Sequence, residues 1–477
     1  MPEPAQEISP DVSVVQRSRW FTPRNLIVFT ILWMVAFSIG SLFISFPFKS
    51  ETSAAAVPNY WHVMYLHGLL IGLVGLLALT ACQVLRLRSM HTRVFVVIGV
   101  IVATLAASIG GIFDKRIPGA EVAMWTQIVG FFALDEILLV LFIGMAAEWR
   151  RRSALTRSLA YAAAMAATAS MFAAAVMGHL AGWLLEFGGH PAVLADYARA
   201  VGLKVSDWNG SLIGSHSHDM VVAVMAMTVS LAVVQFGGLS LARRARTVVR
   251  VGMGLVGFGV IAMTVMYLVM GFTTWAPPTL FQSAGGTNGV AGDDIVTGVF
   301  VMGGGLLALA TVVFAQRGVL RAHVARLASA WAWLLSFAMV VVAGFVIELH
   351  ETYFGAGSAA SGAAKDAVFT WLHQDIGLLL LPAMALIMVI VERLVARRYQ
   401  AVIAWGAISG TSLVFAGGLV FVFITPALHG VGFVITTIGL VIVGATLLSA
   451  LWALVRSAPV SARMPLSVAE EAVQEAK

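Results

Sequence analysis

Long apolar segments with almost no charge set the strongest constraint on how this chain can fold. About 20 consecutive apolar residues let an α-helix cross the ~30 Å hydrocarbon core of a bilayer. Twelve segments reach that length, at roughly 25–47, 60–87, 92–113, 122–148, 155–186, 213–237, 247–275, 294–317, 325–350, 367–391, 402–426 and 430–456. The sequence therefore predicts an all-α, polytopic integral membrane protein, a bundle of twelve transmembrane helices. We expect the glycine clusters inside these segments, such as Gly303-Gly304-Gly305 and Gly417-Gly418, to allow close helix packing.

The composition excludes the main classes of water-soluble protein. Of the 477 residues, 60% are hydrophobic and 11% are charged, against about 25% charged in ordinary globular proteins. The mean hydropathy is +0.93. Soluble enzymes, disordered scaffolds and nucleic-acid-binding proteins are excluded, so the expected surroundings are a lipid bilayer and not a nucleic acid. Cys82 is the only cysteine, so any bound metal is expected to have nitrogen or oxygen ligands.

The basic residues predict how the bundle is oriented. With the N-terminus in the cytoplasm, 23 of the 29 basic residues fall in tails and alternate loops on the inner side, and six fall outside: Lys49, Lys115, Arg116, Arg199, Lys204 and Lys365. This asymmetry follows the positive-inside rule. We expect a multi-pass protein of the cell inner (plasma) membrane with both termini cytoplasmic. Its predicted parts are a tail at 1–24, one transmembrane domain at 25–456 and a second tail at 457–477.

Histidines concentrate in the outer half of this predicted bundle. Of eleven, only His91 and His323 fall in cytoplasmic loops, and the others are His62, His67, His179, His190, His216, His218, His350, His373 and His429. His67, His218 and His373 each lie several residues into a span that starts outside, so they should reach a similar depth. Imidazoles on facing helices can bind haem iron or copper without thiolates. The alternative is that these half-polar rings simply lie at the membrane interface.

Carboxylates accompany two of these three histidines. His216-Ser217-His218-Asp219 and His373-Gln374-Asp375 place acidic side chains beside imidazoles, where a carboxylate can orient a liganding ring or bind a metal itself. Adjacent residues on a helix diverge by about 100° and residues two apart by about 200°. His218 and Asp219 should therefore not face one small site. His216 and His218 could share a metal only if the helix starts between them; otherwise His218 is the better candidate.

Two further carboxylates, Asp135 and Glu136, lie in the middle of the span at 122–148. A charge at that depth costs at least ~2.5–3.5 kcal/mol, so both side chains should face the bundle interior. One interpretation is a proton relay, shared with Asp219, that leads toward the outer-half site. The other is a structural hydrogen bond between helices, for example to Gln127.

Several segments resemble the catalytic subunit of the haem-copper oxidases, a twelve-helix family that includes the nitric oxide reductases. Tyr65-Leu66-His67-Gly68-Leu69-Leu70-Ile71 is similar to the family's helix-2 motif, whose histidine ligates a low-spin haem. Leu349-His350-Glu351-Thr352-Tyr353-Phe354 is similar to the segment before helix 10, which places His373 where helix 10 supplies haem ligands. His218 occupies the place of a copper-ligating histidine, and Pro426-Ala427-Leu428-His429-Gly430 resembles the segment that closes helix 11.

The chain departs from the family pattern at the second metal. The span from Thr247 to Trp275 has no histidine where the family has a His-His pair for copper, and Asp219-Met220-Val221-Val222 follows His218 where oxygen reductases carry Glu and Tyr. The helix-10 pair is reduced to His373. The resemblance implies haem b with His67 and His373 as axial ligands, and a second metal, copper or non-haem iron, at His218 with help from His216.

The resemblance thus implies an oxidoreductase of respiratory or electron-transfer type that reduces a small molecule, O2 or NO, in the outer half of the membrane. An electron donor or accessory membrane subunit would be its partner. Two alternatives remain at this point. Outer histidines together with Asp219, Asp293 and Asp294 could capture a cation for transport, or the chain could be a redox-inactive subunit that keeps the fold.

Overall fold

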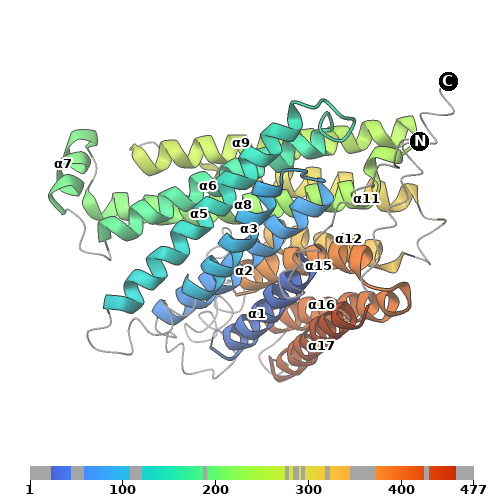
Figure 1. Cartoon of the computed structure of the whole chain (residues 1–477). Helices are drawn as coiled ribbons and strands as arrows, with labels where there is room; N and C mark the ends of the chain where they lie inside the picture. Colours follow the sequence, from blue (N-terminus) through green and yellow to red (C-terminus); the bar gives the residue numbers. More distant parts are fainter. Residues whose placement is uncertain are drawn as a thin grey trace, which may run out of the picture.

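The computed structural model describes residues 23–44, 59–107, 121–185, 191–202, 204–273, 279–282, 289–291, 296–316, 318, 323–343, 371–423 and 429–457. These residues form a bundle of long, roughly aligned helices (Figure 1). The longer helices are α1 (Pro23–Ile44), α2 (Asn59–Val84), α5 (Glu121–Trp149), α6 (Leu159–Leu185), α8 (Val205–Gln235), α9 (Arg243–Phe272), α16 (Arg397–Phe423) and α17 (His429–Arg456).

Four other spans combine an α-helix with a π-helical segment. They are α3 (Met90–Val102) with η2 (Ala103–Ala107), η4 (Val296–Gly303) with α11 (Gly304–Ala315), α12 (Val324–Phe337) with η6 (Ala338–Ala343), and η7 (Leu372–Leu380) with α15 (Leu381–Leu394). Each π segment lies in the half of its span that the sequence places outside. π-Helical turns are rare and occur frequently at functional sites, which draws attention to this end of the bundle.

The predicted spans and the observed helices agree in number and position to a large extent. Ten described helical segments are long and apolar enough to cross a membrane. The other two predicted spans coincide with α1 and α2, whose apolar stretches in the described part are shorter, at Arg24–Ala36 and Gly68–Val84. The all-α, polytopic architecture is confirmed, and the count of twelve spans stays a prediction.

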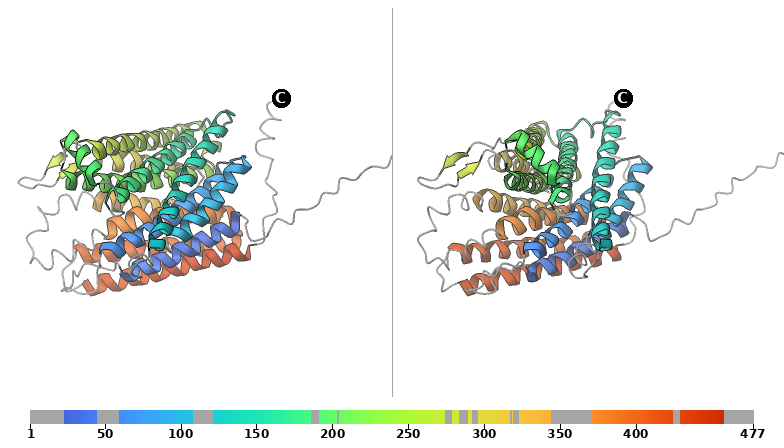
Figure 2. Two further views of the ribbon diagram at one scale, coloured as in Figure 1. Left: turned by 60° about the vertical axis from the view of Figure 1, so that its left-hand side comes forward. Right: turned by 90° about the vertical axis from the view of Figure 1, so that its left-hand side faces the viewer.

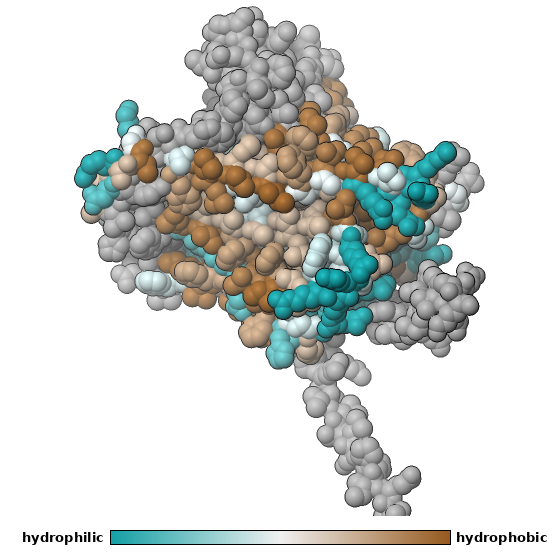
Figure 3. All heavy atoms as spheres, turned by 90° about the horizontal axis from the view of Figure 1, so that it is seen from above, coloured by the Kyte–Doolittle hydropathy of each residue, from teal (hydrophilic) through white to brown (hydrophobic). Residues whose placement is uncertain are grey.

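Large apolar side chains cover the outside of the bundle. Phe132 is 62% exposed, Phe258 58% and Val402 72%. Seen from above, hydrophobic residues form a broad belt, and hydrophilic residues gather toward one end with a smaller group at the other (Figure 3). A water-soluble monomer rarely exposes so much contiguous apolar surface. The belt fits contact with the hydrocarbon of a lipid bilayer.

Three helices form the centre of the bundle. Within their membrane-spanning windows, 78% of the residues of α8 and 83% of those of α15 are buried, against 33% for α9. On α2, residues 71–82 are all buried. Figures 1 and 2 show the other helices around this group, with α16 and α17 side by side at one edge. Any site between α2, α8 and α15 is therefore shielded from lipid.

Glycines let α16 and α17 approach each other closely. A Cβ atom added at Gly417 would lie 2.8 Å from the carbonyl oxygen of Gly432, and one added at Gly439 would lie 2.6 Å from the backbone nitrogen of Val414. Similarly, a Cβ atom added at Gly252 on α9 would lie 2.6 Å from the carbonyl oxygen of Gly304 on α11. Small residues at such crossings are typical of membrane helices. The predicted packing role of Gly304 and Gly417 is confirmed.

Polar contacts join the ends of many helices at one end of the bundle, which we call the basic end. Arg24 on α1 donates hydrogen bonds to the carbonyl oxygens of Leu454, in the last turn of α17, and of Ser457, just after it. The backbone N–H of Arg88 donates to Glu148 Oε1 on α5 at 3.0 Å. The two ends of the helical domain, and the loops predicted to be cytoplasmic, therefore lie together. This agrees with termini on one side of a membrane, although which side is set by the charge rule alone.

The opposite end holds short elements where the sequence predicts only loops. Helix α7 (Pro191–Val201) precedes α8, and α8 begins at Val205, eight residues before the predicted start of its span. The strands β1 (Thr279–Gln282) and β2 (Gly289–Ala291) pair antiparallel as a small hairpin. Figure 2 shows α7 and the hairpin at the same end of the bundle.

Substituting Gly417 by Ala should destabilise the α16–α17 crossing, because the new methyl group meets the backbone of Gly432 and Thr436. Overpacking of this kind costs about 1–3 kcal/mol, which thermal unfolding in detergent would register as a lower Tm. Gly444→Ala on α17 is the matched control, since nothing lies within 4 Å of a Cβ atom there. Equal Tm values for the two variants would contradict the packing role of Gly417.

Candidate functional site

A single arginine fixes the relative depth of the three histidines that the sequence selects. At the basic end, Arg393 of α15 donates to the carbonyl oxygen of Gln83 on α2 at 3.1 Å and to Gln235 Oε1 on α8 at 2.8 Å. The histidines His67, His218 and His373 precede these anchor residues by 16, 17 and 20 positions on α2, α8 and η7–α15. At the α-helical rise of 1.5 Å per residue, His67 and His218 lie ~24 and ~26 Å from the anchor. His373 lies no more than ~30 Å from it, because the π-helical η7 rises less per residue. The predicted common layer is therefore supported by the backbone.

His373 is partly buried on η7, close to the neighbouring span. Its Nδ1 atom lies 3.4 Å from the carbonyl oxygen of Met339 on η6. The two segments come close there, since a Cβ atom on Gly377 would be 2.8 Å from the Cβ atom of Met339. Donation from Nδ1 assigns the proton to that nitrogen and leaves Nε2 as the lone-pair nitrogen. This is the arrangement that a metal-ligating histidine commonly shows.

His218 lies near His373, as the sequence predicts. Helix α8 packs against η7, and the two imidazoles are close enough to interact electrostatically. The Nδ1 atom of His218 lies 2.9 Å from the carbonyl oxygen of Gly214, one turn earlier. Its ring stacks on Tyr267 of α9, with centroids 5.8 Å apart and planes at 30°. Tyr267 is buried and was missed by the sequence analysis, because nothing in its local sequence indicates a histidine neighbour.

His216 points to a different place from His218. Its Nδ1 atom lies 2.7 Å from the carbonyl oxygen of Ala174 on α6, and its ring packs against Gly178, where an added Cβ atom would be 2.5 Å from Cε1. Helix α8 begins at Val205, well before both histidines, so they project about 200° apart. The prediction that His216 helps His218 to bind one metal is therefore wrong.

Most of the other histidines predicted in the outer half have side chains outside the described residues. The backbone of His67 belongs to α2, but its side chain lies outside the described residues. The same holds for the side chains of His62 and His429. His190 and His350 lie outside the described residues altogether, as do Asp293 and Asp294. Among the described side chains, no group of three His, Cys, Asp or Glu residues could hold a metal ion.

Asp219 is fully buried and faces away from His218, toward α6 and α9. Its Oδ1 atom accepts hydrogen bonds from Ser170 Oγ at 2.8 Å and from Thr264 Oγ1 at 3.1 Å. The two hydroxyl oxygens are themselves 2.8 Å apart. Its Oδ2 atom is buried with no hydrogen-bond partner among the described residues. The predicted separation of Asp219 from His218 is confirmed, and Ser170 and Thr264 are partners that sequence spacing could not identify.

The carboxylates Asp135 and Glu136 have different surroundings in the structure. The Oδ2 atom of Asp135 lies 2.7 Å from Nδ1 of His179 on α6, and that ring stacks on Phe132 at 5.3 Å. Asp135 therefore faces a neighbouring helix, as predicted, although its partner is not the expected Gln127. Glu136 is exposed. The prediction that Glu136 faces the bundle interior is wrong, because the next residue on a helix turns by about 100°.

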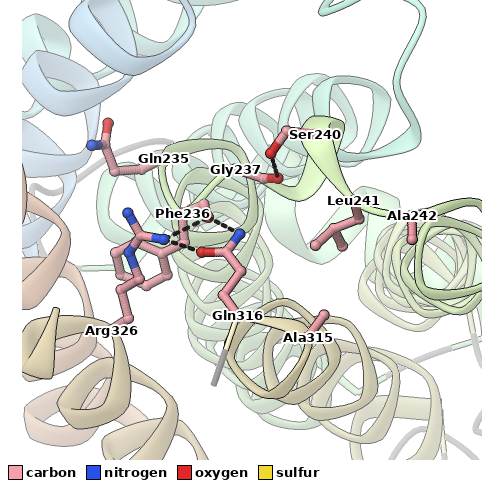
Figure 4. A pocket seen from close by; sticks show the side chains of 9 residues that line it. All are labelled: Gln235, Phe236, Gly237, Ser240, Leu241, Ala242, Ala315, Gln316 and Arg326. Atoms are coloured by element: carbon pink, nitrogen blue, oxygen red, sulfur yellow. Dashed lines mark hydrogen bonds between the residues drawn. The ribbon is translucent and has the colours of Figure 1, made fainter. Parts of the chain in front are cut away.

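A second polar region lies at the basic end, next to a cavity of about 380 Å³. Arg326 donates to Gln316 Oε1 and to the carbonyl oxygen of Phe236 at 3.3 Å, and Gln316 Nε2 donates to the same carbonyl oxygen at 2.9 Å (Figure 4). Arg326 also donates to Glu392 Oε1 at 2.6 Å. The nearby His323 has Nδ1 3.3 Å from Glu392 Oε1. Burial and the charge of Arg326 lower the pKa of His323, an effect that Glu392 opposes. Because these charged side chains pair with one another, we interpret the region as structural and not as a ligand site. Its contacts hold the ends of neighbouring helices together.

Removing the hydroxyl of Thr264 should destabilise the protein through Asp219. A buried acceptor that loses a partner costs about 1–3 kcal/mol, so Thr264→Val should lower the Tm measured in detergent. In an Asp219→Leu background, the same change should cost much less, because no carboxylate is left unsatisfied. Thr437→Val is the matched control, since that hydroxyl bonds only to its own helix at Phe433. An equal cost of Thr264→Val in both backgrounds would refute the coupling.

No family model matches this chain, and no curated protein or solved structure shows significant similarity to it. Its function therefore has to be argued from its own residues.

Proposed function

We propose that this multi-pass membrane protein is a haem protein that carries electrons, with His67 and His373 as the axial ligands of haem b. The resemblance to the haem-copper oxidases suggests the cofactor, and the described geometry is compatible with it. Reduction of a small molecule such as O2 or NO is the corresponding activity. This proposal concerns the layer of histidines between the central helices α2, α8 and α15.

The observation that carries the proposal is the placement of His373. It is partly buried, its Nδ1 atom is held by the carbonyl oxygen of Met339, and its Nε2 atom is the nitrogen left to bind iron. Counting residues from the Arg393 contacts supports a similar depth for His67 of α2. Two histidines from adjacent parallel helices are a usual way for a helical bundle to hold haem.

Bound haem would supply a one-electron redox centre, and the protein would supply its surroundings. The membrane-spanning windows of α8 and α15 are mostly buried; within the layer, His373 is partly buried and the side chain of His218 is exposed. His218 stacks on Tyr267 and is close enough to His373 to interact with it electrostatically. A second metal has weaker support, because His216 projects elsewhere and the described residues offer no three-ligand cluster.

Asp219 can store a proton inside the bundle. Its carboxylate joins α6, α8 and α9 through Ser170 and Thr264, and one oxygen has no partner among the described residues. A desolvated carboxylate of this kind binds a proton readily. Within the proposal, Asp219 would take up a proton when an electron arrives and release it when the electron leaves. Asp135 can do so only in company with His179, and Glu136 has no part in this relay.

The oxygen atoms grouped around Asp219 favour a second candidate function, cation transport. The carboxylate of Asp219 and the hydroxyls of Ser170 and Thr264 are oxygen ligands from three helices. One buried oxygen of Asp219 has no partner among the described residues and is available to a small cation. This reading needs no haem. It differs from the first proposal in one simple respect, because a transporter of this kind would be colourless.

The test is the reduced-minus-oxidised optical spectrum of detergent-purified protein, with iron and copper measured in the same sample. The wild-type chain should show b-type haem bands with iron near one or two per chain. His373→Ala and His67→Ala should each lose the bands and the iron, because each variant removes one of the two proposed axial ligands. Copper should be low in all samples.

His91→Ala is the matched control, since this exposed histidine lies at the basic end at the start of α3, and it should keep the full spectrum. Haem retained in both ligand variants, or a colourless wild-type protein expressed with ample haem, would overturn the proposal. Cation uptake by a colourless protein in liposomes would favour the transporter, and a colourless protein without uptake would favour a redox-inactive subunit.

A further inference from the structure

Helix α5 exposes a continuous stripe of side chains along its membrane-spanning length. The stripe recurs every three or four residues and consists of Trp125, Val129, Phe132, Glu136, Leu139 and Ile143. Five of these residues are large and apolar, as expected for a face in contact with lipid. Glu136 is the exception, and it lies near the middle of the span Trp125–Trp149.

The position of Glu136 is costly if only lipid covers it. A carboxylate in the hydrocarbon core is disfavoured unless it faces the protein interior, a water-filled space or a partner. No hydrogen bond or ion pair joins Glu136 to another described residue. Its neighbour Asp135 is already engaged with His179, so the nearest imidazole does not compensate Glu136.

This chain has no cation in its described part that could reach Glu136 from a second copy. All described lysines and arginines lie within about two turns of a helix end or in loops. A symmetric dimer through α5 would instead bring Glu136 against Glu136 of the second copy, and two adjacent carboxylates repel each other. Charge complementarity therefore favours a different protein that supplies a positive charge at mid-membrane depth.

We propose that the exposed face of α5 binds a transmembrane helix of another protein, and that a single Lys or Arg near the middle of that helix pairs with Glu136. The spacing of the stripe fits a helix that packs along α5 at a shallow angle, with apolar side chains above and below the charged pair. Phe132 and Leu139 flank Glu136 by about one turn on either side and provide that apolar contact. The inference is independent of whether haem is bound.

The test uses the full-length chain in phosphatidylcholine vesicles with synthetic peptides as probes. One peptide is a Leu-rich transmembrane helix with a single central Lys, and the other carries Leu at that position. The photo-crosslinker p-benzoylphenylalanine replaces Phe132 on the α5 face or, as the matched control, Phe258 on the exposed face of α9. Both phenylalanines are similarly exposed, at 62% and 58%.

At position 132 the Lys peptide should give about tenfold more adduct than the Leu peptide, as expected for one interhelical polar contact in a membrane. Glu136→Gln should remove this excess while leaving the adduct at position 258 and the Tm unchanged, since Glu136 touches no described partner. Three results would overturn the proposal: equal yields with both peptides, an excess that survives Glu136→Gln, and adducts between two copies of the chain that exclude the peptide.

Discussion

The pairing of Arg393 with two other helices is the contact on which the arrangement of the central bundle depends. Its guanidinium reaches Gln83 on α2 and Gln235 on α8, so three parallel helices share one reference point at the basic end. A partly buried arginine bound to a carbonyl and an amide restricts the sliding of one helix past another. The depth of every residue on these helices then follows from counting. In this way one contact at the basic end sets the layer in which His67, His218 and His373 lie, about 25 Å away.

Much of the fold follows from the sequence because helices in lipid obey few rules. Apolar length predicts each span, and arginines such as Arg24 and Arg326 mark one end of the bundle. The start of α8 could not be predicted, since its first turns at 205–212 are polar enough to suggest a loop. The hairpin of β1 and β2 was missed for a related reason, because short strands in a glycine-rich segment lack a clear alternating pattern.

The candidate site was only partly predictable, and the reason is rotational. Depth depends on residue counting, so the common layer of the three histidines could be inferred. Orientation depends on which neighbour a helix face meets, and a difference of one or two residues changes the face entirely. His216 and His218 therefore separate, and Asp219 turns to Ser170 and Thr264, which lie 49 and 45 residues away in the chain. Such partners are set by tertiary packing and leave no local signal.

Asp219 and Glu136 show two ways in which a membrane protein accommodates a carboxylate. Asp219 is enclosed by α6, α8 and α9 and receives two hydroxyl donors, so its environment is complete except for one oxygen. Glu136 lies on an apolar face with no described donor near it, so the described residues leave its environment incomplete. An exposed carboxylate at mid-membrane depth costs free energy. A mutation of Glu136 to any apolar residue would remove that cost. The presence of Glu136 on this face is therefore better explained by a contact between proteins than by the packing of the bundle.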